Sequence, residues 1–485
     1  MDSRPPLPEA LWQRIPADVQ VALCALWAVS EARLRQAETR LTQLEAQVRE
    51  LQARLHQNSA NSSKPPSSDP PSVKRAPPRP PSGRKPGGQP GHEKQERAFV
   101  PTADIRDCKP TACRNCCRPL AGDDPQPLCC QVWELPVPQP LVTEYRRHRL
   151  TCSSCGVRTC AALPAGVQGQ DGPRLQACVS LLTGAYSLSK SQAAQLCTEL
   201  LGVPMSPSQV CALEAQMGQH LEPVVAELLQ AARQQPGHMD ETGLGRKLWL
   251  WTFVTRAITI FTVAASRSRR VVSQLLGGDY QQVLTTDRYS VYGHLGGRLR
   301  QLCWAHVRRD CQAMIDRQDV GSTYGDGLLF LSDMLFGWWH RVRDETLSRR
   351  TLQQRLGANG WFRQEFRRLL HAGADSTSAR TAGTCRELLG MEASLWTFAF
   401  VVDVEPTNNA AERALRHGVL WRKRSHGPKS WQGATYLANM WSVVETCRQQ
   451  GRNVLAELTR CCQAALNNRK MPSLLPTATP APIGA

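Results

Sequence analysis

Three carboxylates at distant points of the chain have the residue type and setting for binding divalent cations. Asp240 lies in HMDETG, Asp287 in TTDRYSVY and Glu412 in TNNAAERALR. Phosphoryl transfer on a nucleic acid backbone commonly uses two such cations. Magnesium binds through a few carboxylates and keeps several of its waters. If the fold brings these three side chains together, they form a minimal two-magnesium site.

Each acid also has an ordinary structural interpretation. An aspartate at a strand end is more often a cap or turn residue than a metal ligand. Glu412 lies four residues before Arg416, a spacing that also allows an ion pair within one helix. Glu241 follows Asp240 and points to the opposite face of a strand, so it replaces Asp240 as the candidate if the register is shifted by one residue.

A basic segment follows Glu412. From Arg413 through Val444 there is no acid, and Trp421 and Trp431 lie among the positive charges. Basic residues interleaved with aromatics suit a DNA backbone with stacked bases, although a solvated basic helix face is the simpler alternative. The residues predicted to contact DNA are Asn408, Arg413, Arg416, Arg422, Lys423, Arg424 and His306.

The stretch CWAHVRRD after the second acid contains Cys303 and His306. Their spacing resembles half of a metal site, but no second pair accompanies them. A packing or active-site role is therefore favoured, and we hypothesise that His306 orients the scissile phosphate.

The elements that must position the acids can be read from the pattern of apolar residues. KLWLWTFVT and AITIFTVAA predict a β-hairpin, a short strand precedes Asp240, and QQVLTTD predicts a strand that ends at Asp287. Helical patterns fill residues 322–373, and TNNAAERALR begins another helix. Two acids at strand ends and one on a late helix predict a ribonuclease-H-like α/β core interrupted by an all-α insertion.

Nine of the nineteen cysteines lie between Cys108 and Cys160. Two CxxC pairs, separated by 35 residues, have the spacing of a zinc ribbon, with Zn²⁺ in a structural role because four thiolates leave no open position. We predict the ligands to be Cys113, Cys116, Cys152 and Cys155, with strands between the pairs. Cys108, Cys117, Cys129, Cys130 and Cys160 leave the identity of the ligands open.

The three segments before the core differ in composition and in the spacing of their apolar residues. Residues 34–55 carry apolar residues at 3-4 spacing, which predicts a self-associating coiled coil; an amphipathic helix packed on its own protein is the alternative. A basic, proline-rich segment follows and predicts a disordered linker. Residues 174–233 are helical, with Ser206 as a helix N-cap and Pro207 behind it, and are compatible with a helix-turn-helix or an ordinary helical hairpin.

The chain of 485 residues has a formal net charge of +18, which favours nucleic acid over a membrane surface as partner. We find no pattern of a signal peptide or membrane span, so we expect a cytoplasmic protein. The predicted fold class is multidomain α/β. Its segments are a coiled coil (1–58), a linker (59–98), a zinc ribbon (99–165), a helical DNA-binding module (166–235), the core (236–316 and 401–470), a helical insertion (317–400) and a disordered tail (471–485).

These motifs resemble those of the transposases of insertion-sequence family sixty-six, the C protein of those elements. The resemblance rests on HMDETG, TTDRYSVY with CWAHVRRD, and TNNAAERALR with RKR beyond it. It extends to NSSKPPSSD at 61–69, GRKPGGQPGH at 83–92 and the two CxxC pairs, and so covers nearly the whole chain. Two departures concern DNA contacts: Arg288 stands where many relatives have glycine, and the residues after RKR diverge.

The resemblance implies a DDE transposase with catalytic acids at Asp240, Asp287 and Glu412. Such an enzyme uses two Mg²⁺, or Mn²⁺, to hydrolyse a strand at the element end and to join the freed 3′-hydroxyl to target DNA. Its expected partners are element-end DNA, target DNA, further copies of the chain and accessory proteins of the element. A catalytically decayed DNA-binding protein or repressor, and a nuclease acting on RNA in hybrids, are the alternatives.

Overall fold

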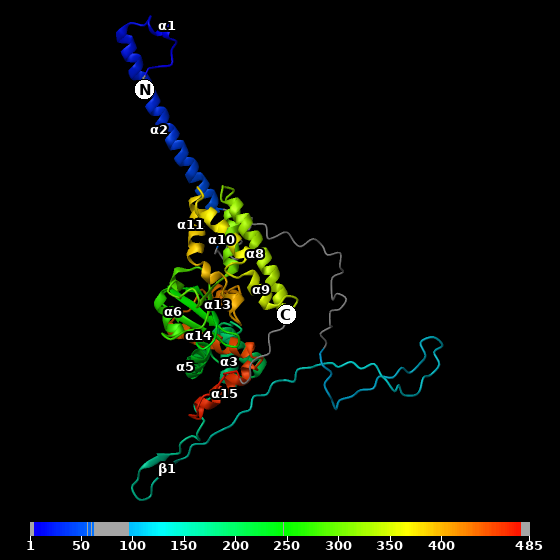
Figure 1. Cartoon of the computed structure of the whole chain (residues 1–485). Coiled ribbons are helices and arrows are strands. Elements are labelled where there is room, and N and C mark those ends of the chain that lie inside the picture. Colours follow the sequence, from blue (N-terminus) through cyan, green and yellow to red (C-terminus); the bar gives the residue numbers. More distant parts are fainter. Residues whose placement is uncertain (1–3, 56, 60, 63–96, 246, 477–485) are drawn as a thin grey trace.

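A five-stranded mixed sheet lies at the centre of the largest folded unit (Figure 1). The computed structural model describes residues 4–55, 57–59, 61–62, 97–245 and 247–476. The strands of the sheet are β3 (Gly237–Gly245), β4 (Leu248–Val254), β5 (Thr259–Ala264), β6 (Leu284–Thr286) and β7 (Arg300–Leu302). Their order is β5-β4-β3-β6-β7. β3, β4 and β5 are antiparallel neighbours, whereas β6 is parallel to β3 and β7. The predicted hairpin is confirmed, and the arrangement is consistent with a ribonuclease-H-like core.

The two aspartates differ in their position along the strands. Asp287 directly follows β6, as predicted. Asp240 lies inside β3, paired with Thr252 of β4, and not at a strand end. The prediction was wrong because the polar stretch after Asp240 continues to pair with the apolar strand β4 as far as Gly245.

Helices cover the sheet and connect its last strand to the carboxyl-terminal part of the core. In this part of the chain the helices are α6 (Arg269–Leu276), α7 (Trp304–Asp316), α13 (Asn409–Ser425), α14 (Trp431–Gln449) and α15 (Val454–Leu466), with a 3₁₀ turn, η2 (Ser290–Tyr292). α13 packs on β3 and β4, and α14 packs on β5. Gly418 allows the close approach of α13, because a Cβ there would lie 2.4 Å from the Leu250 side chain. The helix that begins at TNNAAERALR is thus held directly over the strand that carries Asp240.

The helical module before the core consists of α3 (Pro173–Gly184), α4 (Lys190–Leu201) and α5 (Pro207–Ala232). Ser206 caps α5 in a capping box with Gln209, as predicted, and Gly202 ends α4 with φ +67°. The left-handed conformation at Gly202 suits a residue without a Cβ. α5 packs on α14 and α3 packs on α15, so the module is joined to the core. DNA reading by α4 and α5 stays a prediction.

Between residues 317 and 400 the elements are helical, as predicted. They are α8 (Ser322–Arg343), α9 (Arg349–Arg355), α10 (Trp361–Ala374), α11 (Ala379–Gly390), η3 (Glu392–Leu395) and α12 (Thr397–Phe400). This insertion has an aromatic core of its own, in which Phe362, Phe366 and Trp396 are fully buried. Trp304 of α7 belongs to the same cluster, so the insertion packs on the helix that follows the sheet.

Two helices begin the chain, α1 (Glu9–Trp12) and α2 (Ala17–Leu55). α2 projects away from the core (Figure 1). The predicted apolar seam is exposed along it, with Leu34 61% and Leu41 60% exposed. Packing of this seam on its own protein is therefore ruled out for the described chain, and self-association stays a prediction. Residues 63–96 of the predicted linker lie outside the described residues.

The cysteine-rich segment contains one small hairpin, β1 (Arg149–Thr151) with β2 (Arg158–Cys160). The strands predicted over 132–148 are absent from this described segment, where the apolar side chains are largely exposed. Pro136, Pro138 and Pro140 explain the difference, because proline cannot donate to a strand ladder.

The end of the described chain packs on the core. Leu474 is fully buried, and its carbonyl accepts a hydrogen bond from Gln450 (3.0 Å). The prediction of a disordered tail was therefore wrong for 471–476, and residues 477–485 lie outside the described chain. None of the described helices is long and apolar enough to cross a membrane.

Candidate active site

Asp240, Asp287 and Glu412 come from three elements and lie close enough for the charges of Asp287 and Glu412 to act on Asp240, although among the described residues their oxygens do not all lie within 4.8 Å of one another. Asp240 comes from β3, Asp287 follows β6 and Glu412 lies in the first turn of α13. Burial raises the pKa of Asp240 well above its usual range, and the negative charges of Glu241, Asp287 and Glu412 raise it further. One hydrogen bond, from the backbone N–H of Glu241 at 2.9 Å, opposes the shift. Negative charge is thus concentrated at a buried point with little compensation from the protein.

The neighbouring acid, Glu241, points elsewhere and is fully engaged. Its side chain accepts hydrogen bonds from Arg267 Nε (2.6 Å) and from the Tyr292 hydroxyl (2.6 Å). Arg267 in turn lies over the ring of Tyr289, 3.8 Å from its centroid. Glu241 therefore helps to fix the turn after Asp287, and Asp240 is the acid that faces the other two.

The backbone of Asp287 is held by the adjacent strand. Its carbonyl accepts a hydrogen bond from Arg300 Nη2 (2.7 Å), and its Oδ1 accepts one from the backbone N–H of Tyr289 (2.9 Å). The next residue, Arg288, forms ion pairs with Asp310 of α7 (2.8 Å) and with Glu387 of α11 in the insertion. Arg288 therefore ties the turn at the second acid to α7 and to the helical insertion.

Glu412 pairs with residues of α7. Its Oε1 lies 3.5 Å from Arg309 Nη2 and 3.7 Å from His306 Nδ1. The alternative ion pair with Arg416 is not formed in the described structure. Glu412 Oε1 and His306 Nδ1 are both buried without a hydrogen-bond partner at these distances. The carboxylate of Glu412 is therefore held in position, while its Oε1 has no hydrogen-bond partner.

Arg309 also sets the tautomer of His306. Its Nη1 lies 3.2 Å from His306 Nε2, and a guanidinium only donates, so Nε2 accepts and the proton lies on Nδ1. Burial and the charge of Arg309 lower the pKa of His306, which favours the neutral ring. His306 therefore presents Nδ1–H to Glu412. Arg309 had not been predicted to take part, although its spacing of three residues from His306 on one helix could have indicated it.

Cys303, His306 and Glu412 together have the distances of a metal site, with ligand atoms within 4.8 Å of one another. The contacts of Cys303 fit a packing role. Burial raises the pKa of Cys303 to about 12, so the thiol stays protonated, and it accepts a hydrogen bond from the backbone N–H of Asn408 (3.1 Å). His306 Nδ1 carries its proton as well. The group is better described as packing around Glu412, which agrees with the favoured interpretation of CWAHVRRD.

Asn408 is placed differently from a DNA-contacting residue. It is fully buried, and its Nδ2 donates to the Met239 carbonyl (2.9 Å). This bond joins the start of α13 to β3 beside Asp240. Asn408 thus positions two of the three acids, and it has no surface to offer to DNA.

The predicted cationic DNA contacts fall on α13. Arg413, Arg416, Lys423 and Arg424 are exposed. Arg422 is half-buried and donates to the Gly243 carbonyl of β3. Four cations therefore form an accessible face on the helix that begins at Glu412.

The two CxxC pairs have matching backbone geometry. The N–H of Cys113 donates to Arg118 O and that of Cys152 donates to Val157 O, both at 2.9 Å. Backbone N–H groups of the following residues lower the pKa of the Cys113 and Cys152 thiols, which favours thiolates. Among the described residues, however, the four sulfurs are not gathered into one cluster.

Comparison with known proteins matches this chain to two families. Residues 168–436, more than half of the chain, match the family described as "Transposase IS66 family". Residues 4–98 match a family of unknown function (DUF6444). An uncharacterized protein, y4qI, of Sinorhizobium fredii (strain NBRC 101917 / NGR234) is 24% identical over 296 residues, which are 53% of this chain and 53% of that protein. The chain thus covers about half the length of this curated relative.

Proposed function

The chain belongs to the IS66 family of transposases, and on this basis we propose that it cuts and joins DNA. It binds the ends of an insertion sequence, hydrolyses the strand at the element end and joins the freed 3′-hydroxyl to target DNA. The reaction is a two-metal-ion phosphoryl transfer at Asp240, Asp287 and Glu412. The core that carries them is ribonuclease-H-like.

One observation carries this proposal, namely the charge at Asp240. A half-buried carboxyl whose pKa is raised by desolvation and by three neighbouring acids is costly to ionise unless a cation compensates it. The unsatisfied Oε1 of Glu412 adds a second oxygen in need of a partner. Hard oxygen donors of this kind fit Mg²⁺ or Mn²⁺.

Asp240, Asp287 and Glu412 would hold the metal ions, which would supply activation of the attacking water or 3′-hydroxyl and stabilisation of the leaving oxygen. The residues of the chain fix the geometry for that chemistry. Asn408 holds α13 against β3, while Arg300 and Tyr289 hold the turn at Asp287. His306 and Arg309 orient the carboxylate of Glu412 from the α7 side. The acids are thereby held in place before DNA binds.

The remaining segments bind and organise the DNA in this proposal. The exposed cations of α13 contact the phosphate backbone next to the acids, where counterion release favours binding. The helical module of α3, α4 and α5 adds contacts to the element end. α2 joins copies of the chain through its exposed seam, and accessory proteins of the element complete the assembly in the cytoplasm.

Cleavage of labelled element ends tests the function. Purified chain is incubated with Mg²⁺ and DNA carrying the ends of the element that encodes it, beside an Asp287→Ala variant. We expect strand cleavage and strand transfer by the intact chain and neither by the variant. Tight binding of the ends without cleavage by the intact chain would instead favour the decayed DNA-binding protein.

We predict that His306→Ala lowers the cleavage rate by about 10- to 100-fold, the usual effect of removing a group that orients a metal ligand. Because Glu412 loses its orientation and not its charge, the variant also needs a higher Mg²⁺ concentration for half-maximal cleavage. Cleavage rates over a Mg²⁺ titration measure both effects. His340→Ala, a change in the insertion, is the matched control. If His306→Ala cleaves at the rate of this control, His306 does not orient Glu412 for cleavage.

We also predict that the full chain purifies with one tightly held Zn²⁺ in a structural role. Cys113, Cys116, Cys152 and Cys155 are the proposed ligands, and zinc binding brings the two knuckles together. Metal analysis of the intact chain, of Cys113→Ser and of Cys108→Ser measures this. Zinc should be lost only from Cys113→Ser; loss from Cys108→Ser alone would reassign the ligands.

A further inference from the structure

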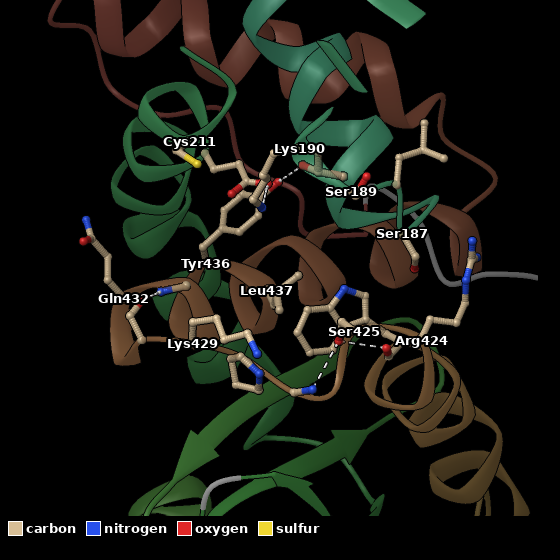
Figure 2. A pocket seen from close by; sticks show the side chains of 18 of the residues that line it. Ser187, Ser189, Lys190, Cys211, Arg424, Ser425, Lys429, Gln432, Tyr436 and Leu437 are labelled. Atoms are coloured by element: carbon tan, nitrogen blue, oxygen red, sulfur yellow. Dashed lines mark hydrogen bonds and ion pairs between the residues drawn. The ribbon is translucent and has the colours of Figure 1, made fainter. Parts of the chain in front are cut away.

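A cavity of about 670 Å³ lies where the helical module meets the turn after α13. Ser187, Ser189 and Lys190 line it from the module, Arg424 lines it from the last turn of α13, and Lys429 lines it from the turn between α13 and α14 (Figure 2). Arg424 and Lys429 are exposed, so the cavity opens to solvent at its basic side. Its size is within the range of about 300 to 1,000 Å³ that holds small organic groups.

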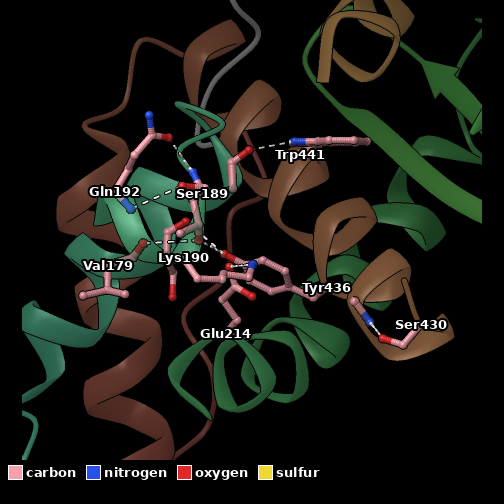
Figure 3. Close-up of polar contacts among 12 residues, drawn as sticks. Val179, Ser189, Lys190, Gln192, Glu214, Ser430, Tyr436 and Trp441 are labelled. Carbon is pink, nitrogen blue, oxygen red and sulfur yellow. Dashed lines mark hydrogen bonds and ion pairs between the residues drawn. The ribbon is translucent and has the colours of Figure 1, made fainter. Parts of the chain in front are cut away.

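The lining combines an aromatic wall with a positive rim. Trp421 forms part of the wall and is braced edge to face by Trp441, with ring centroids 5.9 Å apart. Lys190 is paired with Glu214 (Figure 3), and Arg424 lies exposed at the rim of the cavity. An apolar, aromatic interior behind two cations suits a flat base attached to phosphates.

The cavity wall is fixed to the strand that carries Asp240. Gly427, in the turn, has φ +87°, and a Cβ there would lie 2.7 Å from the Leu244 carbonyl of β3. Arg422 holds Gly243 of the same strand. Leu244 is four residues beyond Asp240, about 13 Å at 3.3 Å per strand residue.

We propose that this cavity receives one extrahelical nucleobase of the DNA bound at the active site. The base stacks beside Trp421, and Arg424 and Lys429 hold the flanking phosphates. This inference rests on the proposed function, because it takes DNA as the substrate, and it adds a second point at which the element end is gripped.

Fluorescence of 2-aminopurine tests the proposal. The analogue is placed at each successive position near the cleavage site of the element end, and the duplex is bound to the full chain without divalent metal. We expect a several-fold change in fluorescence at one position, because a base taken out of the stack loses its quenching neighbours.

Three variants separate insertion from general electrostatic binding. Cys211→Phe fills the cavity from α5 and should abolish the fluorescence change while the ends still bind. Arg424→Gln and Lys423→Gln each remove one cation from α13, but only Arg424 lines the cavity, so only Arg424→Gln should reduce the change. Cleavage with no fluorescence change at any position, or a change that persists in Cys211→Phe, overturns the inference and leaves the proposed function intact. Failure of the intact chain to bind element ends would contradict both the inference and the proposed function.

Discussion

Glu412→Gln should abolish strand cleavage while the chain stays folded and still binds element ends. Glutamine keeps the shape of the side chain but removes the negative charge that a cation requires. The expected loss is about 10³-fold, as for other single groups that stabilise charge in a transition state. Single-turnover cleavage of labelled ends and a gel-shift titration measure the two properties on the same preparation.

The matched control for this variant is Glu365→Gln in the insertion. Glu365 lies on α10 and pairs with Arg368 at the surface, where an ion pair contributes little. We expect normal cleavage from this control. If Glu412→Gln cleaves at the rate of Glu365→Gln, Glu412 is an ordinary helix residue paired with Arg309, and the third metal ligand has been misassigned.

Asp240→Asn should remove activity and at the same time stabilise the metal-free chain. The pKa of Asp240 is raised from its usual 3.8 by burial and by neighbouring acids, so the folded state holds the proton more tightly than the unfolded state. The stability of the metal-free chain therefore falls as pH rises from 3.8 through the raised pKa. Asparagine removes this cost, and we expect a gain on the order of 1 kcal/mol at neutral pH. Thermal unfolding of both proteins in a chelating buffer measures it.

The adjacent acid, Glu241, supplies a control in which the stability of the metal-free chain should change in the opposite direction. Glu241→Gln leaves Arg267 without its buried partner, and a loss of about 1–3 kcal/mol is expected for such an uncompensated group. Adding Mg²⁺ should stabilise the wild-type chain but not Asp240→Asn, because a ligand stabilises only the state that binds it. Destabilisation by Asp240→Asn, or equal stabilisation of both chains by Mg²⁺, would contradict the assignment.

Much of the core could be predicted from local pattern. The hairpin of β4 and β5 was evident because aromatic and β-branched residues alternate around a short break, and Ser206 with Gln209 marked the start of α5. Asp287 was placed correctly because its strand is short and apolar. The three acids were chosen as candidates from residue type, position in the predicted order of elements, and family resemblance, and their catalytic role stays a prediction.

Other features depended on tertiary contacts that local pattern does not contain. The extent of β3 is set by pairing with β4, which carries the strand past Asp240. The burial of Asn408 follows from the packing of α13 on β3, whereas its spacing from Glu412 had indicated only a shared helix face. Leu474 was predicted to lie in a disordered tail because few of its neighbours in sequence are apolar. Its burial depends on packing near the end of α14, which local pattern does not show. The role of Arg309 depends on α7 meeting α13, which are about a hundred residues apart in sequence.

Exchange of the metal ion at Asp287 tests the central claim most directly. A thiolate binds Mn²⁺ more readily than Mg²⁺, because Mg²⁺ is the harder cation. Asp287→Cys should therefore be inactive in Mg²⁺ and should regain part of its cleavage of element ends in Mn²⁺, whereas Asp287→Ala should stay inactive in both. Equal cleavage by Asp287→Cys in the two metals, or restoration of Asp287→Ala by Mn²⁺, would contradict metal binding by this carboxylate.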